Sequence, residues 1–170
     1  MQYDKNGEAI GLESGAMSAV GGRLHYALAY GNTSAWTFWQ ITSGGPSVHA
    51  LMVGDQPDNK YYAAKHFWKW VRPGAVRIYA GPDGGEDGVC VSAYQHEKEK
   101  TVTVVVLNRS HDKADISIDL KTDVPVSQFQ VFRSTETEHC AEQQAIGVEG
   151  GKAALRMPPR SMVTLYCESK

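Results

Sequence analysis

The residues best suited to chemistry lie in one aromatic stretch, residues 32–45, which reads NTSAWTFWQITSGG. Side chains alternate between the two faces of a strand, so Trp36 and Phe38 would face one way and Trp39 the other. A fixed indole can stack on the flat C–H face of a sugar ring at low entropic cost, because tryptophan has only two side-chain torsions. The competing interpretation is that both tryptophans are core residues.

A strand over residues 34–40 would position Trp39 for this chemistry if it belonged to a barrel. The small Ala35 and Thr37 fit a barrel interior, and the other two rings would then pack outward on helices. Trp39 would face inward at the carboxyl end of the strand, where barrel enzymes hold their substrates. The glycine-rich continuation would form the rim of that site.

The histidines give weaker signals than the tryptophans. His66 shares a face with apolar residues, which favours a hydrogen-bonded core histidine over a catalytic base. His49 follows the aromatic stretch in a loop, where it could face either a substrate or solvent. The triplets that begin at Asn32 and Asn108 match the glycosylation pattern, although Asn32 is better explained as a helix stop.

The cysteines do not indicate a metal site or a disulfide scaffold. The chain has three, Cys90, Cys140 and Cys167, which is an odd number without CxxC spacing. Cys90 and Cys167 lie in strand-like runs and are interpreted as small core residues. A pair between Cys140 and Cys167 would indicate oxidising surroundings. The sequence predicts no metal and no cofactor.

Composition describes an ordinary globular protein. The 170 residues are 42% hydrophobic and 21% charged, with a formal net charge of −2. The charge gives no sign of nucleic-acid binding, and the longest apolar runs are too short to span a bilayer. The first residues, MQYDKNGEAIG, show no signal-peptide pattern.

Two helices are predicted on either side of the aromatic stretch. The first falls within residues 14–32, where Met17, Val20, Leu24 and Leu28 recur at helical spacing before Gly31 and Asn32. The second covers residues 59–71, with Asp58 or Asn59 as its cap and Pro73 beyond its end.

After residue 73 the pattern changes to short β-branched or alternating runs separated by turn residues. Seven strands are predicted, in residues 75–80, 88–94, 101–110, 114–120, 127–134, 152–158 and 161–168. The run HEKEK, residues 96–100, is predicted to form a hairpin tip. Residues 74–170 are therefore expected to form an antiparallel β-sandwich.

The sequences SAWTFWQ, NKYYAAKHFWKWVRPGAVRI and VCVSAYQHEKEKTVTVVVLNRS together resemble the C-terminal part of glycoside hydrolase family 30. The resemblance implies an α/β plus all-β fold, in which the end of a (β/α)8 barrel is followed by a β-sandwich. Residues 1–73 would supply a helix, the eighth strand and the eighth helix, and residues 74–170 the sandwich. It also implies retaining hydrolysis of β-linked glycosides or polysaccharides, with Trp39 and Gln40 as substrate-binding residues.

The same resemblance leaves the catalytic residues unassigned. Retention needs two carboxyl groups, which the family carries at the ends of its fourth and seventh strands. Glu13 is a candidate nucleophile, although a residue in the first turn of a helix is the better interpretation. The chain is therefore expected to be a truncated hydrolase that is inactive alone, so whether it is itself an enzyme stays open.

Two further expectations concern partners and location. The family implies a carbohydrate partner and an extracellular or periplasmic parent enzyme. Because the family's sandwich also uses strand material from before the barrel, uncovered strands could lead to self-association. The alternative function is a stand-alone carbohydrate-binding or structural β-sandwich module, with Tyr79 and Tyr94 as its exposed aromatic residues.

Overall fold

The computed structural model describes residues 20–47, 49–81, 84–85 and 88–169. Both predicted helices are present, as α2 (Gly22–Ala29) and α3 (Asn59–Trp68). The stop after α2 is confirmed, because Asn32 has a left-handed φ of 48°. The cap of α3 is Asp58, whose side chain accepts a hydrogen bond from the backbone N–H of Lys60. Met17, predicted on the apolar face of the first helix, lies outside the described residues.

Residues 34–40, predicted as a strand, do not form a paired strand in this structure. That segment has no strand pairing, and the first strand, β1 (Thr42–Ser43), begins after it. A strand needs a neighbouring backbone to satisfy its hydrogen-bonding groups, and within the described ranges no strand lies alongside residues 34–40.

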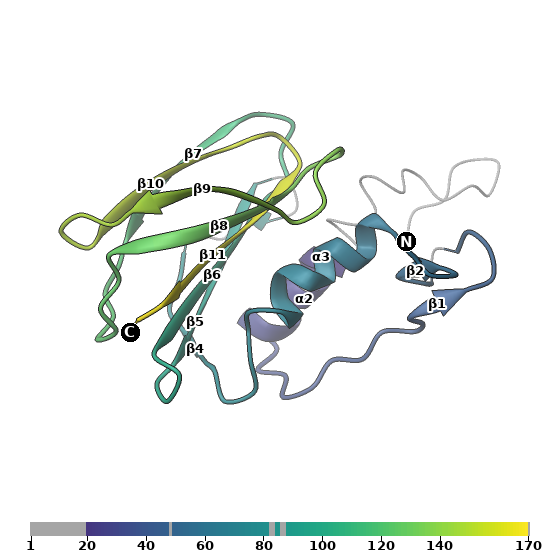
Figure 1. Cartoon of the computed structure of the whole chain (residues 1–170), viewed down its shortest axis with the longest axis horizontal. Helices are drawn as coiled ribbons and strands as arrows, with labels where there is room; N and C mark the ends of the chain where they lie inside the picture. The colour runs from purple at the N-terminus through teal and green to yellow at the C-terminus, as the bar shows by residue number, and fades with distance from the viewer. Residues whose placement is uncertain (1–19, 48, 82–83, 86–87, 170) are drawn as a thin grey trace.

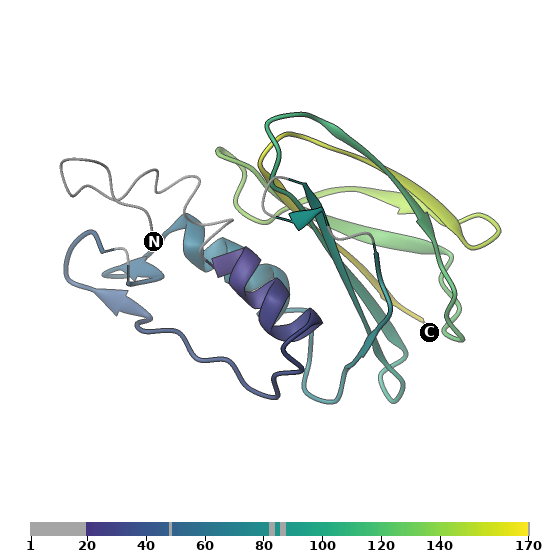
Figure 2. The same ribbon diagram turned by 180° about the vertical axis from the view of Figure 1, so that it is seen from behind.

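A small sheet that sequence analysis did not predict follows the aromatic stretch. It joins β1 to β2 (Met52–Val53) in parallel and β2 to β3 (Gln56–Pro57) antiparallel. The sheet lies on the far side of the helices from the larger strands (Figures 1 and 2).

The predicted antiparallel β-sandwich is confirmed. A six-stranded sheet has the order β4-β5-β6-β11-β8-β9, and a two-stranded sheet pairs β10 with β7. The strands are β4 (Val76–Ile78), β5 (Val89–His96), β6 (Thr101–Asn108), β7 (Ala114–Asp119), β8 (Gln128–Ser134), β9 (Ala141–Gly147), β10 (Lys152–Met157) and β11 (Ser161–Glu168). The HEKEK run forms the turn between β5 and β6, as predicted, whereas β9 was missed.

The large sheet is covered on both faces. Helices α2 and α3 lie on one face, and β7 and β10 lie on the other (Figures 1 and 2). Every residue of β6 is buried, because Val105 and Leu107 face the helices while Val104 and Val106 pack between the sheets. Such continuous apolar strands are typical of a sheet that is covered on both faces.

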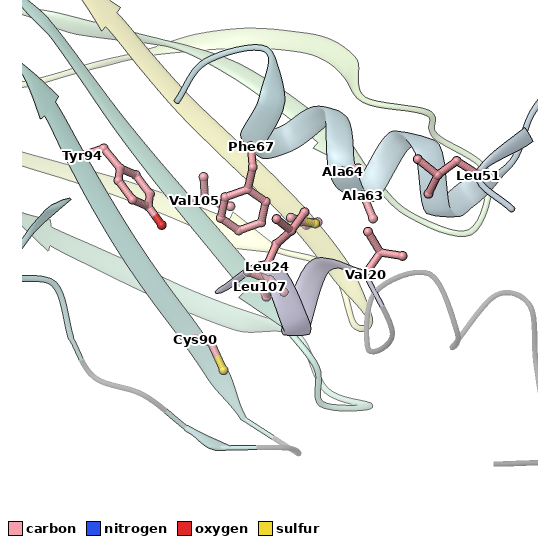
Figure 3. Close-up of a cluster of buried hydrophobic side chains, with 11 residues drawn as sticks. Val20, Leu24, Leu51, Ala63, Ala64, Phe67, Cys90, Tyr94, Val105 and Leu107 are labelled. Atoms are coloured by element: carbon pink, nitrogen blue, oxygen red, sulfur yellow. The ribbon is translucent and has the colours of Figure 1, made fainter. Parts of the chain in front are cut away.

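The helix-facing core fixes how α2 and α3 sit on the sheet. Leu24 of α2 and Phe67 of α3 meet Val105 and Leu107 of β6 in one buried cluster (Figure 3). Fully burying one such side chain contributes about 1.5–3 kcal/mol. The helices are therefore held against the sandwich by ordinary apolar packing.

Two expectations about single residues are corrected by this packing. Tyr94 is only 3% exposed, because the helices cover the face of β5 from which it projects. Cys140 and Cys167 do not pair with each other, and both are buried. The interpretation of Cys90 and Cys167 as core residues is confirmed.

The connection from α3 to β4 depends on Gly74. Its φ is 98°, a left-handed value that favours glycine, and a Cβ atom there would lie 2.8 Å from Nε2 of His96. That nitrogen lies 3.1 Å from the carbonyl oxygen of Pro73. The close approach explains why glycine stands at this position in the sequence RPGAVRI.

Candidate glycan-binding site

The three aromatic residues of the stretch separate onto two sides. Trp36 and Phe38 stack with ring centroids 5.7 Å apart and pack against the helix-facing core. Trp36 also lies 6.3 Å from the ring of Trp68 in α3. Trp39, in contrast, is 79% exposed. The alternation predicted for a strand is therefore present although the segment pairs with no strand.

Backbone hydrogen bonds fix the chain immediately after Trp39. The N–H of Gln40 donates to the carbonyl of His49, and the N–H of Leu51 donates to Gln40 O (3.0 Å) and Ile41 O (3.2 Å). The peptide bond between Trp39 and Gln40 is cis. The hydrogen bonds of Gln40 and Ile41 tie the segment that carries Trp39 to His49 and Leu51, which precede β2.

The surroundings of Trp39 form an exposed rim. We use "rim" for Trp39, Gln40, Ile41, Ser47 and His49. Ile41 and His49 are exposed, and Gln40 is half-buried. An exposed indole offers a flat apolar surface, while the amide of Gln40 and the imidazole of His49 can form hydrogen bonds with hydroxyl groups. This arrangement suits a sugar ring, which has apolar C–H faces and polar edges.

His66, the histidine predicted in the core, has a structural role. His66 is fully buried, with Nδ1 2.8 Å from Thr164 Oγ1 and Nε2 2.8 Å from Ser134 Oγ. Burial, and to a lesser extent the nearby charge of Lys65, lower the pKa of His66 to about 3. The prediction of a hydrogen-bonded core histidine is confirmed.

The structure assigns no catalytic or metal-binding cluster within the described ranges. No group of three or more His, Cys, Asp or Glu side chains there could hold a metal ion. Glu13 lies outside the described residues. Asp58, the carboxylate that follows the rim, caps α3 and forms an ion pair of 3.0 Å with Lys60. Over those ranges no helix is long and apolar enough to cross a membrane.

One residue near the rim was missed by sequence analysis. Lys60 is almost fully buried and contacts both Asp58 and Ser47. Nothing in the sequence around Lys60 indicates this, because Ser47 is thirteen positions away in a separate loop.

The fold is that of the sandwich region of a glycoside hydrolase. Residues 74–165 match the profile described as the glycosyl hydrolase family 30 beta sandwich domain. The chain belongs to glycosyl hydrolase family 30, as its resemblance to that family predicts.

Curated relatives are xylan-degrading enzymes by name. The glucuronoxylanase XynC of Bacillus subtilis is 33% identical over 109 residues, which are 64% of this chain and 22% of that protein. The glucuronoxylanase XynC of Bacillus subtilis strain 168 is 26% identical over 146 residues, covering 85% of this chain and 33% of that protein. The chain thus spans about a fifth to a third of the length of these relatives.

Solved structures share the fold over nearly the whole chain. The GH30 subfamily 8 xylanase Xyn30A from Clostridium acetobutylicum has a TM-score of 0.82 at 22% identity, covering 95% of this chain and 41% of that one. A GH30 endoxylanase from Clostridium papyrosolvens C71 has a TM-score of 0.79 at 20% identity, covering 92% and 39%. At these coverages the shared fold extends beyond the sandwich.

Proposed function

We propose that this chain is the C-terminal part of a retaining glycoside hydrolase that acts on a β-linked glycan of the xylan type. Residues 1–73 would form the end of a (β/α)8 barrel, in which residues 34–40 become the eighth strand beside strands of the longer protein. Residues 74–170 would form the attached sandwich. The names of the curated relatives support the xylan assignment.

The observation that carries this proposal is the exposure of Trp39. Its indole is 79% exposed, whereas Trp70 is 5% exposed and Trp36 packs on the helix-facing core. A large aromatic ring that is held on a hydrogen-bonded backbone and left open to solvent is a good platform for a sugar. Gln40, next to it, would contribute hydrogen bonds to sugar hydroxyl groups.

The proposal places the catalytic carboxyl groups outside the described residues. Retaining glycosidases hold an acid/base and a nucleophile about 5 Å apart, one on each side of the scissile bond. Because residues 1–73 are assigned only a helix, the eighth strand and the eighth helix, the chain is expected to bind glycan without hydrolysing it. The longer enzyme would act on an extracellular or periplasmic glycan, and exposed strand edges of the shorter chain would promote self-association.

A titration of tryptophan fluorescence tests the binding function. Xylan, β-glucan and galactan oligosaccharides are added separately to the full chain, and saturable quenching is expected with the xylan series. Trp39→Ala should weaken this binding about tenfold or more, which corresponds to about 1.4 kcal/mol. Equal affinity in the wild type and Trp39→Ala would contradict the proposal.

The second candidate is a stand-alone carbohydrate-binding β-sandwich, favoured by Tyr79, which is 92% exposed beside β4. Tyr79→Ala is therefore the matched control in the same titration. Binding that Tyr79→Ala abolishes and Trp39→Ala leaves unchanged would favour the sandwich as the sugar site.

A further inference from the structure

Lys60 occupies an unusual position for a lysine. Its side chain is almost fully buried, since the residue is only 3% exposed, and it is the second residue of α3. The ammonium Nζ donates to the carbonyl oxygen of Ser47 at 2.7 Å and lies 3.0 Å from Oδ2 of Asp58. Both partners precede α3 in the chain.

Stability of the helix does not explain this arrangement. A positive charge in the first turn of a helix opposes the helix macrodipole, and a buried ammonium loses its hydration. Asp58 offsets part of that cost but could cap α3 without a lysine beside it. The contact that only a long cationic side chain supplies is the one to the Ser47 carbonyl.

Ser47 is in turn linked by hydrogen bonds to the backbone next to Trp39. The Ser47 hydroxyl oxygen accepts a hydrogen bond of 3.1 Å from the N–H of His49. The carbonyl of His49 in turn accepts from the N–H of Gln40, the residue bonded to Trp39. Three consecutive hydrogen bonds therefore connect the buried ammonium of Lys60 to the backbone that carries the exposed indole.

We propose that Lys60 is a positioning residue, which fixes the rim through Ser47 and His49 and so sets the orientation of Trp39. The effect on sugar binding rests on the proposed function of Trp39, whereas the effect on the rim does not. Neither Lys60 nor its partners needs to touch the sugar.

The test uses the full chain labelled with ¹⁵N, in which the four tryptophans give four indole N–H signals. Trp39→Phe assigns the signal of Trp39 by its disappearance. In Lys60→Met the Trp39 signal is expected to shift or broaden, while the buried Trp70 signal stays in place and shows that the fold is intact. Binding of xylan oligosaccharides should weaken by about tenfold, because loss of a charge-assisted hydrogen bond releases the rim.

Control variants separate positioning from a general effect. Lys65→Met removes a lysine of the same helix that makes no described contact with the rim, and it should leave the Trp39 signal unchanged. Lys60→Arg, which keeps the cationic donor, should restore part of the wild-type signal and affinity. Lys60→Gln, whose neutral head is easier to bury but too short to reach Ser47, replaces Lys60→Met if that variant does not fold.

An unchanged Trp39 signal in folded Lys60→Met or Lys60→Gln would overturn the positioning role, whatever the sugar affinity. If the wild type binds no glycan while the Trp39 signal still moves, the proposed function fails and the positioning role stands. If the signal moves and affinity does not, Lys60 orders the rim without setting the sugar site, and the functional part of the inference is overturned.

Discussion

Replacing His66 by glutamine should make folding stability much less sensitive to mild acid. The hydroxyl of Thr164 donates to the carbonyl of His66 at 3.0 Å, so its oxygen is left to accept from Nδ1–H. Ser134 Oγ accepts from the N–H of Cys140 at 2.8 Å and can donate its own proton to Nε2. The network therefore fits a neutral ring with its proton on Nδ1.

The magnitude follows from the difference between the folded and unfolded states. The pKa of His66 is about 3 in the folded chain, against an ordinary value of 6.5. Below pH 6.5 the imidazole of His66 is protonated in the unfolded chain but not in the folded chain, so the free energy of unfolding falls as the pH drops toward 3. Between pH 7.5 and pH 5 this costs the wild type about 2 kcal/mol, at about 1.4 kcal/mol per pH unit.

Urea unfolding followed by circular dichroism at several pH values between 7.5 and 5 measures the effect. At pH 7.5 His66→Gln should be less stable than the wild type by about 1–3 kcal/mol, since the hydrogen bonds are imperfectly replaced. At pH 5 that gap should have narrowed by about 2 kcal/mol, because the variant has no imidazole to protonate. A gap that stays constant across the pH range would refute the assignment of His66 as a buried neutral group.

Two further changes test the fold. Gly74→Ala should lower the free energy of unfolding in urea by about 1–3 kcal/mol, because alanine would be held at a left-handed φ with its Cβ 2.8 Å from Nε2 of His96. Gly45→Ala is the control: its Cβ would meet no atom within 4 Å, so the free energy of unfolding should change little. Equal costs would contradict the account of the helix-to-strand connection. Phe129→Ala should cost about 3–5 kcal/mol, because the ring is fully buried between the two sheets, and a thermal midpoint within a degree or two of the wild type would show that the inter-sheet core is misplaced.

Features with a strong local pattern could be predicted from the sequence. The β-branched run of β6 indicated a strand, and Asp58 or Asn59 marked the start of α3. His66 could be interpreted correctly because its helical spacing placed it among apolar residues. In each case the sequence pattern that supports the prediction lies within one element and its immediate flanks.

Features that depend on distant partners could not be predicted. β9 is an exposed edge strand with a polar sequence, AEQQAIG, and pairing with β8 rather than its own propensity makes it a strand. Tyr94 was expected to be exposed because nothing in its strand shows that two helices lie over that face. The burial of Lys60 could not be predicted either, because it depends on a contact with Ser47 in a separate loop.

The central claim is that the indole of Trp39 receives a sugar ring, and indole N–H spectra recorded during a titration with xylan oligosaccharides test it most directly. The account predicts that the Trp39 signal shifts saturably while the signal of buried Trp70 remains in place. An unmoved Trp39 signal at oligosaccharide concentrations that saturate binding elsewhere on the chain, or the absence of any binding, would contradict it.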